Sequence, residues 1–92
     1  MNFEHEALAR YQFANSISTA LEMYPNRDVI VVGSSIHSSI EEVLQKFPNA
    51  KRTQFNRLKV GNKLFIFLDK FDSRIMGFQR DKIVMVHVWK RY

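Results

Sequence analysis

The feature that most constrains this chain is the stretch from Val29 to Glu42, an apolar run followed by a glycine, a serine-rich segment and a helical pattern. The residues 29–32 are consecutive and β-branched, without alternation, which is typical of a strand buried on both faces of an α/β sheet. A strand that runs through a Gly/Ser loop into a helix presents free backbone N–H groups at the helix N-terminus. The stretch therefore predicts an α/β arrangement with a candidate anion site.

This candidate anion site consists of the glycine and the polar residues after it, namely Gly33, Ser34, Ser35, His37 and Ser38. The pattern G-x-x-x-x-G-K-[ST] laid on the glycine puts Ser39 where the lysine of an ATP-binding loop belongs. Without that lysine no cation contacts the β- and γ-phosphates, so ATP hydrolysis is not expected. A serine-capped turn without a ligand and a turn that contacts phosphate both fit the sequence.

Helical periodicity is found on both sides of the predicted strand. Apolar residues recur every three or four positions from Asn2 to about Met23, which predicts a first helix that ends before Pro25. A second helix is predicted from Ile36 to about Phe47. The first helix carries apolar residues on two sides, so it could pack only within the chain or also form a homo-oligomer.

The second half of the chain is predicted to be rich in β structure. Two strand-like runs, 53–60 and 63–69, flank a Gly-Asn turn signal and predict a hairpin. The run 82–90 is apolar on both faces and is expected beside the strand 29–32, after a loop at 71–81. Residues 1–92 are therefore predicted to form one α/β or α+β domain, with two helices on a small mixed four-stranded sheet in the order helix, strand, helix, hairpin, strand.

The net charge of +5 is unevenly distributed along the chain. Residues 1–50 carry three basic and six acidic residues, whereas residues 51–92 carry eleven basic and three acidic residues. Basic residues and an aromatic ring gather around the predicted hairpin and the loop after it: Arg52, Phe55, Arg57, Lys59, Lys63, Arg74 and Arg80. Cations interleaved with aromatic rings suit phosphate neutralisation and base stacking. A solvated sheet face without a ligand has the same composition.

Sequence patterns of enzymatic chemistry are missing. The chain has no cysteine, so it has no thiol nucleophile and no cysteine metal site. His5, His37 and His87 have no partners at metal-ligand spacing, and no G-x-S-x-G motif occurs. We expect no enzymatic activity, no metal and no cofactor. An acidic N-terminus and the lack of a long apolar run predict a cytoplasmic protein without a membrane partner.

Residues 53–88 carry a series of features in a fixed order: 56–67 as a polar hairpin, Arg74 and Gly77 as a loop, Asp81 as an acid before a strand, and Ile83–Val86 as that strand. In this order the features resemble part of the P-loop ATPase core of the viral large terminases, the motors that package viral DNA. His87 and Val88 stand where the Asp-Glu pair of this family should follow. The resemblance implies a remnant or mimic of an ATPase core that cannot hydrolyse ATP.

These patterns predict a small, basic, non-enzymatic accessory protein from a phage or mobile element, acting in the host cytoplasm if viral. It is expected to bind DNA or RNA with little sequence specificity through the basic, aromatic hairpin. The alternative is a protein-interaction module or inhibitor that docks the same basic face on an acidic partner protein.

Overall fold

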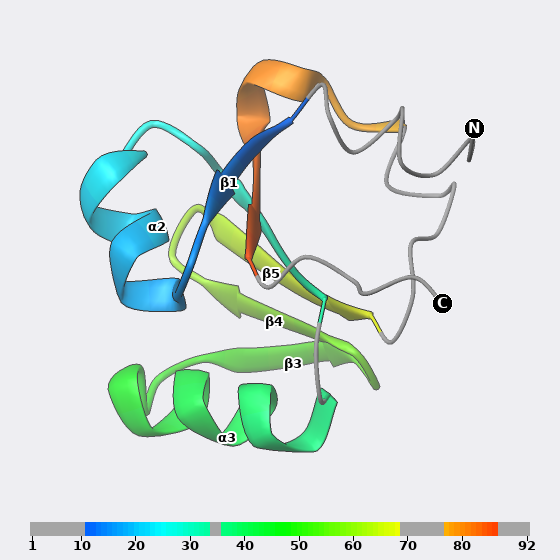
Figure 1. The fold of residues 1–92 in the computed structure, drawn as a ribbon. Coiled ribbons are helices and arrows are strands. Elements are labelled where there is room, and N and C mark those ends of the chain that lie inside the picture. The colour runs from blue at the N-terminus through cyan, green and yellow to red at the C-terminus, as the bar shows by residue number, and fades with distance from the viewer. Residues whose placement is uncertain (1–10, 34–35, 69–76, 87–92) are drawn as a thin grey trace, which may run out of the picture.

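The computed structural model describes residues 11–33, 36–68 and 77–86 of the chain. In chain order the elements are β1 (Gln12–Ala14), α2 (Ile17–Met23), β2 (Val29–Gly33), α3 (Ile36–Lys46), β3 (Lys51–Gln54), β4 (Arg57–Val60), β5 (Lys63–Leu68), the 3₁₀ turn η2 (Arg80–Lys82) and β6 (Ile83–Val86). The strands form one six-stranded mixed sheet in the order β1-β6-β2-β5-β4-β3 (Figure 1). The predicted α/β class is confirmed, but the four-stranded sheet and the predicted element order are wrong.

Four of the strands, β1, β6, β2 and β5, run parallel to one another. In the centre, Val31 pairs with Met85 of β6 on one side and with Ile66 of β5 on the other. Every residue of β2 and β6 is buried. Two predictions are therefore confirmed: β2 is buried on both faces, and it lies beside the strand that begins at Ile83. Parallel strands are normally covered on both sides in this way.

The antiparallel part of the sheet contains two turns rather than one. The predicted hairpin turn at Gly61 joins β4 to β5. The φ of Gly61 is +59°, in the left-handed region that glycine adopts without a Cβ clash. The predicted single strand 53–60 is wrong, because a second turn at residues 55–56 separates β3 from β4. Asn56 holds this turn against β5, since its Nδ2 donates to the Phe67 carbonyl at 3.1 Å.

The predicted first helix is confirmed over residues 17–23 and wrong over residues 11–16. Gln12–Ala14 form β1, and α2 begins only at Ile17. The helix begins there because Ser16 is its N-cap, with Oγ accepting a hydrogen bond from the Thr19 amide at 3.1 Å. Residues 2–10 of the predicted helix lie outside the described residues. The strand forms because β6 pairs with it, which no local pattern indicates.

Two apolar clusters lie on opposite faces of the sheet. The helices α2 and α3 lie on one side of the sheet, here called the helix face (Figure 1). There, Ile17 of α2 and Val43 of α3 pack in one cluster with Phe65 of β5. On the other side, here called the far face, Val31 and Ile66 pack in a second cluster with residues of β6. Side chains of β5 therefore alternate between the two clusters.

Candidate functional site

The β3–β4 hairpin brings three cations together on the far face. Lys51 and Lys59 are directly opposite each other in the antiparallel register. Lys59 also pairs with Leu64, and Arg57 pairs with Ile66, and both of these apolar residues belong to the far-face cluster. Since directly paired residues project from the same face of a sheet, the three cations lie side by side there. We call Lys51, Arg57 and Lys59 the basic patch.

The basic patch is electrostatically unfavourable on its own. Like charges at directly opposite positions destabilise an antiparallel pair, and both lysines are exposed. Arg57 is half-buried, and its Nε is buried without a hydrogen-bond partner among the described residues. The ion pair found among the described residues joins Lys82 to Asp28 and lies away from the patch. An anion bound at the patch would supply the opposite charge that the two lysines lack.

Phe55 occupies the turn between β3 and β4, and 71% of its surface is exposed. Both Nε and Nη2 of Arg52 donate to the Phe55 carbonyl, the former at 3.1 Å. On the other side of the turn, the Phe67 amide donates to the Asn56 carbonyl at 2.9 Å. The turn is thus held at both ends while the ring projects into solvent. Arg52 itself pairs with Leu58 and so belongs to the helix face, not to the basic patch.

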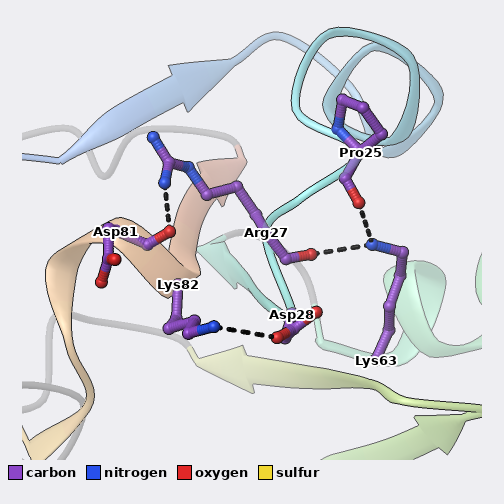
Figure 2. A network of polar contacts seen from close by, with 6 residues as sticks. All are labelled: Pro25, Arg27, Asp28, Lys63, Asp81 and Lys82. Atoms are coloured by element: carbon purple, nitrogen blue, oxygen red, sulfur yellow. Dashed lines mark hydrogen bonds and ion pairs between the residues drawn. The ribbon is translucent and has the colours of Figure 1, made fainter.

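Lys63 lies at the other turn and contacts a different part of the protein. Its Nζ donates to the carbonyls of Pro25 at 3.0 Å and Arg27 at 2.8 Å (Figure 2). Close by, Arg27 donates to the Asp81 carbonyl, so these contacts tie the loop before β2 to both β5 and η2. The position of Lys63 is explained by this network, and the structure does not bring it to the basic patch.

The other predicted binding residues are dispersed. Arg80 is exposed in η2, which precedes β6 and therefore lies at the amino ends of the parallel strands. The Phe55 turn contacts Phe67, near the carboxyl end of β5, so the two lie at opposite ends of the sheet. Arg74 lies outside the described residues. Of the predicted binding residues, Arg52, Phe55, Arg57 and Lys59 share the β3–β4 hairpin, with Arg52 on its helix face and the other two cations on its far face.

The predicted anion site at the end of β2 is described only in part. Gly33 is the buried last residue of β2, and the backbone of His37 and Ser38 belongs to the first turn of α3. Ser34 and Ser35 lie outside the described residues, as do the side chains of the other two polar residues. This site stays a prediction.

Lys51 is the member of the patch that the sequence-based set of site residues omitted. The sequence places Lys51 beside Arg52 at the entrance of the predicted hairpin, but a single strand over 53–60 does not pair it with Lys59. The dipeptide Phe55-Asn56 was the available signal, because asparagine favours turns and a turn there pairs the two lysines.

A separate cavity of about 530 Å³ lies on the helix face between α2, the end of α3 and the β4–β5 turn, lined by Leu21, Pro25, Asp28, Phe47, Val60, Asn62, Lys63 and Phe65. The described residues contain no cluster of side chains suited to a metal ion. No helix in the described ranges is long and apolar enough to cross a membrane.

Comparison with known proteins returned no match, whether against protein-family models, curated proteins or solved structures. The function must therefore be inferred from the geometry of the chain itself.

Proposed function

We propose that this protein binds nucleic acid through the β3–β4 hairpin, without catalysing a reaction on it. The observation that carries the proposal is the direct pairing of Lys51 with Lys59 beside Arg57 on one face of the sheet. Two opposed lysines weaken the hairpin, and a polyanion that bridges them removes this cost. Arg57 adds a third cation beside the pair, and its buried Nε has no hydrogen-bond partner among the residues that the structure describes.

The charge distribution supports a polyanion rather than a small anion. Eleven of the basic residues occur after residue 50, and the two lysines of the patch are exposed on the hairpin at the edge of the sheet. Each phosphate contact contributes about 0.7 to 0.9 to the slope of log K against log salt, so three contacts predict a slope of about −2 to −3. Such contacts position the nucleic acid but read no bases, which implies little sequence specificity.

The test compares two double variants that remove the same charge. Lys51→Ala/Lys59→Ala removes the opposed pair, whereas Lys46→Ala/Lys82→Ala removes two exposed lysines from other elements. Binding to a fluorescein-labelled oligonucleotide is measured by polarisation from about 50 to 200 mM NaCl. We expect the first variant to weaken binding about tenfold and to lower the salt slope by about 1.5, with little change in the second.

Equal losses in both double variants would show diffuse attraction to a basic protein and would contradict a hairpin site. No binding by the natural chain at about 50 mM NaCl would contradict the function itself. In that case, salt-sensitive capture of an acidic protein by the same patch would select the alternative, a protein-interaction module or inhibitor.

The resemblance to the terminase ATPase core, a family that handles DNA, also supports nucleic-acid binding. From the same resemblance we infer that the chain originates from a phage or mobile element. Ile83–Val86, the strand that would carry the catalytic acids in that family, pairs in parallel with β2. Because the Asp-Glu pair is replaced by His87 and Val88, we expect no ATP hydrolysis. Release of phosphate from ATP by the purified chain, abolished by substitutions in the β2–α3 loop, would contradict this expectation.

A further inference from the structure

We infer that the nucleic acid bound by the hairpin is single-stranded, with one unpaired base stacked on the ring of Phe55. The inference rests on the proposed function and specifies its substrate class. Phe55 is 71% exposed, whereas Phe65 and Phe67 of the neighbouring strand are fully buried. Its ring therefore makes no contribution to the core that would explain an aromatic residue at this turn.

Hydrogen bonds hold the backbone of the turn that carries the ring. Arg52 donates two hydrogen bonds to the Phe55 carbonyl, and the next residue, Asn56, exchanges hydrogen bonds with Phe67 through its side chain and its carbonyl. Because the backbone of the turn is already ordered, a base that stacks on the ring does not have to order it. Stacking on an aromatic ring is tolerant of base identity, which fits a site without base-edge readers.

The phosphate contacts lie next to the ring along the same hairpin. Gln54 and Arg57 form the last cross-strand pair before the turn, so Arg57 follows Phe55 by two residues. Lys59 comes next on the same face, about 7 Å further along β4, with Lys51 opposite it. A strand whose base stacks on Phe55 can therefore extend its backbone along Arg57 toward the two lysines.

Duplex binding fits the same surface less well. In a duplex the bases stack on one another, so a protruding phenyl ring reaches a base only after the duplex is distorted. A helix that enters the major groove normally carries cations or amides toward the DNA. The exposed side chains described on α3 are Glu41, Glu42, Leu44, Gln45 and Lys46, so two carboxylates that phosphates repel stand against a single cation.

The experiment measures the affinity of the natural chain and its variants for two labelled probes, a short oligothymidine and a hairpin duplex of equal phosphate number. We expect the natural chain to bind the single strand more tightly. Phe55→Ala should weaken single-strand binding about 5- to 100-fold and leave duplex binding nearly unchanged, the range expected for one stacked base. Phe55→Trp should retain the affinity, and its added fluorescence should be quenched by the single strand.

Two controls separate stacking from other effects. Phe55→Leu keeps an apolar side chain without a π face, so it should lose affinity as the alanine variant does. Met23→Ala removes another exposed apolar side chain, on α2, and should leave binding unchanged. Circular dichroism checks that each variant is folded.

The outcomes distinguish this inference from the function on which it rests. Equal affinity for the two probes, or full single-strand affinity in Phe55→Ala or Phe55→Leu, overturns the stacking inference while hairpin binding stands. Absence of binding to either probe overturns the proposed function as well.

Discussion

The central strands β2 and β6 and the edge hairpin β3–β4 belong to one sheet but differ in their surroundings. Every residue of β2 and β6 is buried, and their side chains contribute to clusters on both faces. Every residue of β3 is exposed, and β4 buries only Leu58 fully. The centre therefore provides stability and the edge provides exposed charge.

This difference explains where a binding surface can arise. Substitution of a central residue changes packing on one face of the sheet and affects folding as a whole. Charges at the hairpin contact solvent, so they can accumulate at a small cost in stability. The repulsion between the opposed Lys51 and Lys59 lowers stability in this way, and the edge of the sheet tolerates it.

The largest effect is expected from deleting an aromatic ring in the core. Phe65→Ala should reduce the free energy of unfolding by about 3 to 5 kcal/mol, because its fully buried ring packs 6.1 Å from that of Phe47 and 6.4 Å from that of Phe67, measured between centroids. The matched change Phe55→Ala should alter it by less than about 0.5 kcal/mol. Urea unfolding followed by circular dichroism measures both. Similar losses in the two variants would remove the distinction between centre and edge.

A smaller loss is expected at the turn that joins these two regions. Gly61→Ala should reduce stability by about 1 to 2 kcal/mol, because the φ of +59° is unfavourable for a residue with a Cβ. The added Cβ meets no atom within 4 Å, so the loss is conformational. Gly77→Ala, where φ lies outside the left-handed region and space is also open, should be neutral. Thermal unfolding of the pair checks this, and equal melting temperatures would refute it.

Removing the N-cap side chain at the start of α2 should lower the free energy of unfolding by about 1 kcal/mol. Ser16→Ala removes the Oγ that accepts from the Thr19 amide and should reduce stability by this amount. Ser16→Asp keeps an acceptor at the N-cap and should restore most of it. Chemical denaturation compares the two, and an unchanged midpoint for the alanine variant would show that the cap contributes nothing.

The smallest effect is a gain, and it sharpens the comparison most. Lys59→Glu places a negative charge directly opposite Lys51 and should raise the free energy of unfolding by about 0.2 to 1 kcal/mol. The same change should weaken binding to nucleic acid, because it replaces a cation of the patch. Denaturation at low and at about 1 M salt measures the first effect, which salt should diminish. Loss of stability together with binding would mean that the residue serves the fold.

Much of the fold was predictable because its signals are local. The β-branched run of β2, the periodicity of α3 and the glycine turn before Lys63 each depend on a few neighbouring residues. The strand β1 was not predictable in this way, since Gln12–Ala14 become a strand by pairing with β6, which follows some seventy residues later. Strand pairing over such a distance leaves no periodic pattern in a three-residue segment.

For the candidate site, the sequence alone determined the charge asymmetry and the presence of cations and an aromatic ring between residues 52 and 59. Only the tertiary structure decided which of them share a surface. The turn at Phe55, held by Asn56 and Phe67, pairs Lys51 with Lys59, while backbone carbonyls bind Lys63 away from them. The physical reason is that composition sets the total charge of a segment, whereas strand register and long-range hydrogen bonds set the position of each charge.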